Sequence, residues 1–276
     1  MRIVASLTTI PSRIRKIEPV IKALYNQKSL KFDNIYLNIP LSFKGKKYIL
    51  PEFLNKYDNL KILRCDIDYG PITKLIPVLE VELDPNTIII TFDDDSIPSK
   101  NVLKIFINKV KKYPNTSLSF SGWCIGKFPF YLEFIGDNIK DVEVDWIQGT
   151  HGILYHRRFI NKEELLDYPK PDNKNFLKND DHWISYYLEK NKIKRISIGQ
   201  SYKENFRSSE ICKVDAISGN YSLKFFKEVL NISFYLKNIG IYYRSVSVFN
   251  SIFFKIFLSV ILVIIICVYI IKNIKK

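Results

Sequence analysis

Residues 1–200 contain short apolar runs that are separated by segments with helical spacing. Three runs rich in strand-forming residues, Arg2–Leu7, Asn34–Ile39 and Leu60–Cys65, predict β-strands. A fourth run, Thr87–Phe92 (TIIITF), is continuously apolar. Such continuity is typical of a central strand that is buried on both faces of a sheet.

The segments between these runs repeat their apolar residues every three or four positions, which predicts amphipathic helices. The first helix would begin at Pro11 and Ser12, and Asn179 or Asp180 could cap the last one. The predicted helices are Pro11–Gln27, Ile72–Leu79 with an interruption near Pro77, Asn101–Lys112 and Asp181–Lys190.

Strands that alternate with helices indicate an α/β sandwich with a largely parallel sheet. In open sheets of this kind, ligands bind outside the carboxyl ends of the strands. Residues that directly follow the predicted strands are therefore the first candidates for a functional site.

The C-terminal tail is strongly apolar. Ile252–Ile271 reads IFFKIFLSVILVIIICVYII, and Lys255 is its only charged residue. This length suits a membrane-inserted helix, expected over 251–272, although a buried core helix is the alternative. The amino terminus lacks the long apolar part of a signal peptide. We therefore expect a single-pass or tail-anchored membrane protein whose catalytic domain is cytosolic.

The chain is basic, with 42 Lys and Arg residues against 28 Asp and Glu residues and a formal charge of +14. It lacks zinc-finger spacing, a basic zipper and an aromatic RNA-binding signature, so we expect no nucleic-acid partner. The charge near the tail favours a membrane surface, or the lysines simply solubilise the protein. Residues 201–250 read as a basic amphipathic extension on the acceptor side, with core packing as the alternative for its helical segment.

Three carboxylates, Asp93, Asp94 and Asp95, directly follow the central strand. They repel one another unless a cation neutralises them, and alternate residues such as Asp93 and Asp95 can share one ligand. Oxygen ligands suit Mg²⁺ or Mn²⁺, which in turn bind diphosphates. A polar loop before a helix is the other interpretation of this triplet.

The triplet resembles the D-x-D motif of nucleotide-sugar-dependent glycosyltransferases with the GT-A fold, of the family 2 and exostosin-like types. Three further segments carry the resemblance: Ser6–Arg13 (SLTTIPSR), Gly70–Leu75 (GPITKL) and Asn179–Asp181. It covers about residues 1–200, which we expect to form a GT-A-like (Rossmann-like) α/β/α catalytic domain. The sequence departs from the pattern in two places. The second strand ends Asn38-Ile39-Pro40 without the acidic residue that family 2 enzymes often carry there, and His182 follows the late acidic pair where an apolar residue is common.

The resemblance also implies roles for individual residues. Asp93 would contact the ribose and share the metal that Asp95 ligates on the diphosphate, and Asp94 beside them would also bind the donor. Asp181 would be the catalytic base that deprotonates an acceptor hydroxyl, with Asp180 as its alternative; helix capping explains one of the two equally well. The residues expected to line the nucleotide are Thr9, Arg13 and Lys74.

The segment Asp145–Arg158 (DWIQGTHGILYHRR) is unusual in composition. Gly149 suits a backbone that passes close to a ligand, Trp146 could stack on a sugar ring, and His151 is a candidate site residue. His151 and His182 are possible third metal ligands or ordinary hydrogen-bonded histidines.

These observations predict a metal-dependent, inverting glycosyltransferase that uses Mn²⁺ or Mg²⁺ and a nucleotide-sugar donor. Its acceptor would be a glycan, a lipid-linked molecule or a protein at a membrane. A haloacid-dehalogenase-type phosphatase with Asp93 as nucleophile is one rival interpretation. A non-catalytic, membrane-tethered protein that binds glycans or nucleotides is another.

Overall fold

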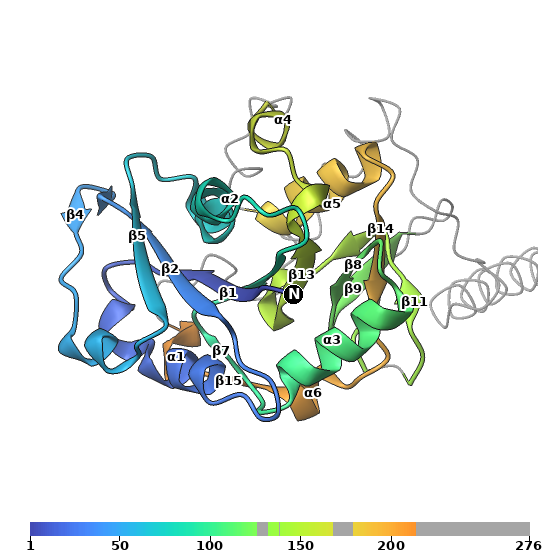
Figure 1. Cartoon of the computed structure of the whole chain (residues 1–276), viewed down its shortest axis with the longest axis horizontal. Helices are drawn as coiled ribbons and strands as arrows, with labels where there is room; N and C mark the ends of the chain where they lie inside the picture. The colour runs from blue at the N-terminus through green and yellow to red at the C-terminus, as the bar shows by residue number, and fades with distance from the viewer. Residues whose placement is uncertain (126–131, 138, 168–178, 214–276) are drawn as a thin grey trace, which may run out of the picture.

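A computed structural model of the whole chain describes residues 1–125, 132–137, 139–167 and 179–213 (Figure 1). The predicted helix at 251–272 and most of the predicted 201–250 extension lie outside these residues. Within the described ranges, no helix is both long and apolar enough to cross a membrane.

Eight strands form the central sheet, in the order β11-β14-β8-β13-β6-β1-β2-β5. The pairs β6–β1, β1–β2, β2–β5 and β8–β14 are parallel, whereas β13 runs antiparallel to both of its neighbours and β11 runs antiparallel to β14. The strands are β1 (Ile3–Thr8), β2 (Asn34–Pro40), β5 (Leu60–Cys65), β6 (Ile88–Phe92), β8 (Thr116–Ser119), β11 (Val142–Glu143), β13 (Ile153–His156) and β14 (Lys194–Ser197). The mixed, mostly parallel sheet confirms the predicted fold class.

Helices cover both faces of the sheet, with α2 and α5 on one side and α1 and α3 on the other (Figure 1). Strand β1 shows why: Ile3, Ala5 and Leu7 pack in the cluster that contains α1 and α3, whereas Val4 packs in the cluster of α2 and α5. Successive side chains of a strand point to opposite faces, so an unbroken apolar run fills both layers.

Two prolines set the helix starts differently from the sequence prediction. The first segment is a 3₁₀ turn at Ile14–Lys16 followed by α1 (Glu18–Tyr25), not one continuous helix. Proline lacks an N–H group and is well tolerated in the first turn of a helix, which is where Pro19 lies in α1. Pro77 likewise lies in the first turn of α2 (Ile76–Val81) and does not interrupt it. The other helices are α3 (Val102–Lys112), α4 (Lys162–Leu166), α5 (Asp180–Lys190) and α6 (Tyr202–Asn205).

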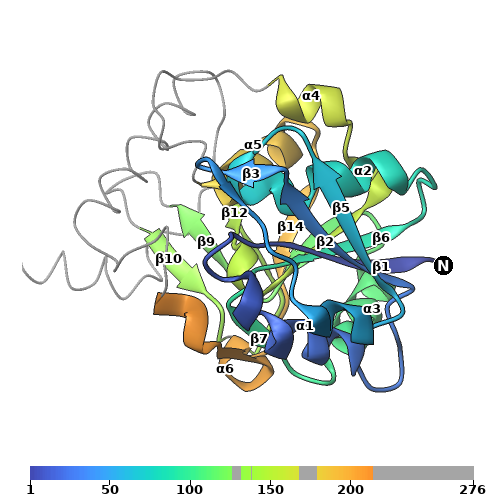
Figure 2. The ribbon, with the colours of Figure 1, turned by 90° about the vertical axis from the view of Figure 1, so that its left-hand side faces the viewer.

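Smaller sheets complete the fold. Strand β15 (Phe206–Ser208) pairs with β7 (Ser96–Pro98), and Figure 2 shows α6 and β7 at the same end of the molecule. Phe206 and Ile211 belong to the main core, so the packed part of the chain extends to at least residue 211. The remaining strands are β9 (Gly122–Ile125), β10 (Leu132–Ile135), β12 (Trp146–Ile147), β3 (Ser42–Phe43) and β4 (Lys46–Lys47).

His182 is buried in α5 against Trp146, with 3.8 Å between the ring centroids. Neither of its ring nitrogens has a hydrogen-bond partner in the described part of the chain. Burial lowers the pKa of His182 to about 3, because a charged imidazolium would lose its hydration there. The folded protein therefore holds a neutral histidine that an unfolded chain protonates near pH 6.5.

We expect this histidine to make stability depend on pH. A lowered folded pKa gives stability that is complete above pH 6.5 and is lost as the pH falls toward 3. Between pH 8 and pH 5 the wild type should lose about 2 kcal/mol more than a His182→Leu variant. Urea unfolding measures this through tryptophan fluorescence, since all three tryptophans are buried in the described fold. Equal losses in the two proteins would contradict it.

Candidate functional site

Three neighbouring parallel strands end at the same edge of the sheet. Leu7 of β1 lies beside Phe92 of β6, and Thr8 of β1 lies beside Asn38 of β2. Thr9 and the triplet that begins at Asp93 therefore emerge together at the carboxyl edge, where open α/β sheets bind their ligands. This placement agrees with the sequence prediction.

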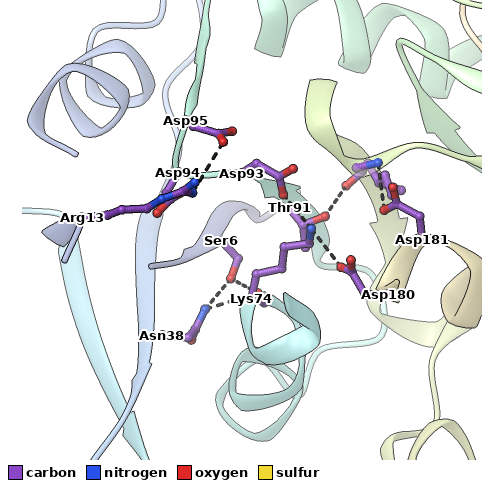
Figure 3. A network of polar contacts seen from close by, with 12 residues as sticks. Ser6, Arg13, Asn38, Lys74, Thr91, Asp93, Asp94, Asp95, Asp180 and Asp181 are labelled. Carbon is purple, nitrogen blue, oxygen red and sulfur yellow. Dashed lines mark hydrogen bonds and ion pairs between the residues drawn. The ribbon is translucent and has the colours of Figure 1, made fainter. Parts of the chain in front are cut away.

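Asp94 is buried and forms a cluster with Thr9 and Arg13. Figure 3 shows Arg13 beside Asp94. The Thr9 hydroxyl donates to Oδ2 of Asp94 at 2.5 Å, and Nη1 of Arg13 donates to Oδ1 at 2.7 Å. Burial raises the pKa of Asp94, while Arg13 and Thr9 act in the opposite direction. The sequence predicts that Thr9, Arg13 and Asp94 line the donor; in the structure Thr9 and Arg13 both bind Asp94, the buried member of the triplet.

Lys74 lies at the centre of a second cluster and is 2% exposed. Its Nζ is 2.7 Å from Oδ1 of Asp93 and 2.9 Å from Oδ2 of Asp180, so one ammonium joins the end of β6 to the start of α5 (Figure 3). Burial acts to lower the pKa of Lys74, but the carboxylates of Asp180, Asp93 and Asp181 outweigh it and raise the pKa. Lys74 therefore stays charged and acts as the internal counter-ion of these carboxylates.

The backbone of Lys74 is held by polar side chains of the sheet. The Ser6 hydroxyl donates to the Lys74 carbonyl oxygen, and Nδ2 of Asn38 donates to the same oxygen at 3.2 Å and to Oγ of Ser6 at 2.7 Å. Asn38 is fully buried. Asn38, near the end of β2, thus helps to position the lysine that binds the carboxylates.

Asp181 faces the turn that precedes β13. Its Oδ1 accepts a hydrogen bond from the backbone N–H of Gly149 at 2.9 Å. Burial and the neighbouring Asp180 raise the pKa of Asp181, while Lys74 acts to lower it. A carboxylate with a raised pKa is a stronger base than an ordinary aspartate. Asn179 occupies the N-cap position of α5 and makes no side-chain capping bond. Asp180 binds Lys74, and Asp181 binds the backbone of Gly149.

Position 149 requires a glycine because the side chains of Asp181 and Lys74 approach its backbone closely. A Cβ at this position would lie 2.6 Å from Oδ1 of Asp181 and 3.1 Å from Nζ of Lys74. We predict that Gly149→Ala displaces the Asp181 carboxylate and lowers the turnover number of the expected sugar transfer at least about tenfold, with little loss of stability. Steady-state kinetics and urea unfolding of this variant measure the two effects. Gly45→Ala is a control for backbone strain away from the site: its Cβ would meet nothing within 4 Å, but its φ of 76° disfavours alanine, so it should cost stability and leave the kinetics unchanged. Unchanged activity in Gly149→Ala would contradict the assignment.

Asp93 and Asp95 keep part of their side chains exposed, at 31% and 24%, unlike Asp94. Burial and the charges of Asp93 and Asp94 raise the pKa of Asp95 to about 6, and Arg13 offsets this only in part. The excess negative charge is what a bound cation would neutralise. Within the described ranges, no group of three or more His, Cys, Asp or Glu side chains is placed to hold a metal.

The aromatic candidates lie behind or beside these clusters. Trp146 is 3% exposed and packs between Trp123 and His182, so stacking on a sugar would require one of these neighbours to move. Nδ1 of His151 lies 2.9 Å from the Ser121 hydroxyl. Burial lowers the pKa of His151 to about 4.

Two side chains near the site had no signal in the sequence. Tyr202 of α6 stacks on His151 with 4.2 Å between ring centroids, and Tyr155 of β13 is fully buried near Lys74, Asp180 and Asp181. Both residues come from segments whose place beside the carboxyl edge depends on tertiary packing. Tyr155 reads as an ordinary strand residue, and Tyr202 follows the predicted domain.

Comparisons with known proteins give a fold and no family. No protein-family model and no curated protein sequence matches the chain. A crystal structure of residues 1–349 of S. aureus TarS with UDP-GlcNAc is similar at a TM-score of 0.56 and 15% identity, covering 88% of this chain and 68% of that one. A second S. aureus TarS structure gives 0.52 and 13%, with 88% and 41% covered. GalNAc-T7 with UDP, GalNAc and Mn²⁺ gives 0.51 and 12%, with 71% and 41% covered.

The alignment thus spans only about two fifths of the longer neighbours. The similarity establishes the GT-A-like, Rossmann-like α/β fold that the resemblance implied.

Proposed function

We propose that the chain is a metal-dependent glycosyltransferase that moves a sugar from a nucleotide-sugar to a hydroxyl acceptor. One observation carries this proposal: Lys74 joins Asp93, after the central strand, to the acidic pair that begins α5, at the carboxyl edge of a GT-A-like sheet. The fold neighbours support it, because TarS was crystallised with UDP-GlcNAc and GalNAc-T7 with UDP, GalNAc and Mn²⁺.

Asp93 and Asp95 are the residues that would hold Mn²⁺ or Mg²⁺. The raised pKa of Asp95 fits a site that lacks positive charge, and carboxylate oxygens suit these ions. Two protein carboxylates leave coordination positions for diphosphate oxygens. When bound, the metal would neutralise negative charge on the leaving diphosphate. Thr9, Arg13 and Asp94 fix the turn that presents the two metal ligands.

Asp181 is our candidate for the catalytic base. It would take the proton of the acceptor hydroxyl as that oxygen bonds to the anomeric carbon and the bond from this carbon to the diphosphate breaks. Attack from the face opposite the leaving group inverts the anomeric configuration. Asp180 is the weaker candidate because Lys74 already binds its carboxylate. Determining the anomer of the product by NMR tests inversion, and a retained anomer would reject it.

The acceptor and the location follow from the sequence expectations alone. A glycan, a lipid-linked molecule or a protein fits as the acceptor, and the apolar tail would bring the domain to a membrane. Gly149 binds Asp181, and His151 belongs to the same short turn, so we assign these two residues and Trp146 to the side where an acceptor or donor sugar would bind.

Donor binding tests this proposal without an acceptor. We would titrate UDP-, GDP- and dTDP-sugars by calorimetry, with Mn²⁺, with Mg²⁺ and with a chelator. One donor should bind in the presence of metal, and Asp95→Ala should weaken that binding at least about tenfold. Absence of binding by every donor would favour the phosphatase or the non-catalytic interpretation, and a phosphoryl-enzyme on Asp93 would identify the phosphatase.

A further inference from the structure

The strands β3 and β4 form a hairpin over residues 41–50 that leaves the sheet directly after β2. We call residues 41–50 the basic hairpin. Lys44 and Gly45 at its tip have φ angles of 49° and 76°. Positive φ at both central residues is the requirement of a two-residue type I′ turn, which matches the twist of the paired strands. The tip is therefore a defined turn.

The base of the basic hairpin is fixed to the rest of the fold. The N–H of Leu41 donates to the Cys65 carbonyl at 2.9 Å, and Arg64 donates to the Leu41 carbonyl at 3.0 Å. The hydroxyl of buried Tyr48 donates to the Thr9 carbonyl at 2.9 Å. Figure 1 shows β4 at the outer edge of the molecule, beyond β5. The basic hairpin is thus fixed at its base, and Tyr48 ties it to Thr9, the residue whose hydroxyl binds Asp94 of the acidic triplet.

The composition of the basic hairpin is unusual for a solvated turn. Leu41, Ile49 and Leu50 expose 51%, 66% and 46% of their surface. They are three of the nine large apolar residues that the described part of the chain exposes. Three exposed lysines lie between them in the chain, and residues 41–50 contain no acidic residue. The lysines are Lys44, Lys46 and Lys47.

We propose that the basic hairpin is a membrane-contact surface for anionic lipid headgroups. Its lysines complement the negative charge of the bilayer surface, and each lysine near that surface adds a similar amount to the free energy of binding. Its exposed leucines and isoleucine reach the boundary between headgroups and acyl chains, as the apolar residues of interfacial segments do. A soluble polyanion would satisfy the lysines but leave the apolar side chains in water.

The acidic residues that follow β5 limit this surface on one side, and the position of the hairpin relates it to the candidate site. Asp66 and Asp68 follow β5 and are exposed, so the acidic side next to Ile67 does not belong to it. The hairpin follows the carboxyl end of β2, the edge at which Thr9 and Asp93 emerge. Binding through it would bring the candidate site close to the headgroups. The inference requires no glycosyl transfer and stands or falls separately from the proposed function.

Amide hydrogen exchange of the full chain tests the proposal locally, whatever the C-terminal tail contributes. On vesicles rich in phosphatidylglycerol, residues 41–50 should exchange at least about threefold more slowly than on phosphatidylcholine vesicles. The variant Lys44→Glu/Lys46→Glu/Lys47→Glu should lose this protection. The matched control Lys100→Glu/Lys104→Glu/Lys111→Glu changes the net charge equally on exposed residues outside the hairpin and should keep it.

A second variant, Ile49→Ser/Leu50→Ser, leaves the turn and its lysines intact and should reduce the protection as well. Equal exchange on the two lipids, or protection that survives the triple charge reversal, would overturn the proposal. Equal protection by soluble polyphosphate would show recognition of phosphate alone and reject a bilayer. Protection that grows with protein concentration in the absence of lipid would indicate contact between two copies and reject it too.

Discussion

Asp181→Asn should lower the turnover number of sugar transfer about 10³-fold, with donor affinity and stability almost unchanged. A positioned general base contributes about 10²–10⁴ to a rate, and asparagine cannot accept the proton. The fold should tolerate the change, because an amide oxygen can still accept the hydrogen bond that Oδ1 of Asp181 receives from the Gly149 N–H. Steady-state kinetics and calorimetric titration of the donor measure the two parts of this prediction.

Asp180→Asn is the matched control, one residue away on the same helix. Asp180 binds Lys74 through an ion pair, so its loss should weaken the arrangement of Asp93 and Asp181 and reduce turnover by a smaller factor. A greater loss in Asp180→Asn than in Asp181→Asn would assign the base to Asp180. Retention of more than a tenth of the turnover by Asp181→Asn would remove it from the chemistry.

Arg13→Met should destabilise the folded protein by about 3–5 kcal/mol, the usual result of removing one partner of a buried ion pair. The side chains of Arg13 and Asp94 are 10% and 8% exposed, and their charged atoms are 2.7 Å apart. Without the guanidinium, Asp94 would lose its ion pair, keep the Thr9 hydroxyl and lie beside two other carboxylates. Urea unfolding followed by tryptophan fluorescence measures this loss without any nucleotide.

The double variant Arg13→Met/Asp94→Asn separates an unpaired charge from lost packing. It removes the stranded carboxylate, so it should recover a large part of the stability that Arg13→Met loses. If Arg13 instead acted by lining the nucleotide, Arg13→Met would weaken donor binding and leave the unfolding midpoint unchanged. That result would return Arg13 to the role expected from the sequence.

The strands and the edge that carries the site were predictable from local sequence. The apolar run Thr87–Phe92 is typical of a buried central strand, and a strand there places the triplet at a carboxyl edge. The triplet and the pair at 180–181 consist of aspartates, whose carboxylates indicate metal binding or proton transfer from the sequence alone. The acidic residues of both segments accordingly gather around the site.

The side chains that each site residue contacts were not predictable, because these contacts depend on distances between segments far apart in the chain. Lys74 has the charge expected of a phosphate ligand, and only the fold shows that two carboxylates surround it. Trp146 has the ring expected of a sugar platform, yet Trp123 of β9 and His182 of α5 pack against it and bury it. The antiparallel insertion of β13 and the pairing of β15 with β7 also depend on long-range contacts that no local pattern encodes.

Release of nucleoside diphosphate from a panel of nucleotide-sugars tests the central claim most directly. Each donor would be incubated with the full chain and candidate acceptors, with Mn²⁺, with Mg²⁺ or with chelator, beside Asp95→Ala and Asp181→Asn. We predict release from one donor that requires metal, transfers the sugar to an acceptor and is lost in both variants. Release that persists in chelator and in both variants, or the absence of release from every donor, would contradict the proposed function.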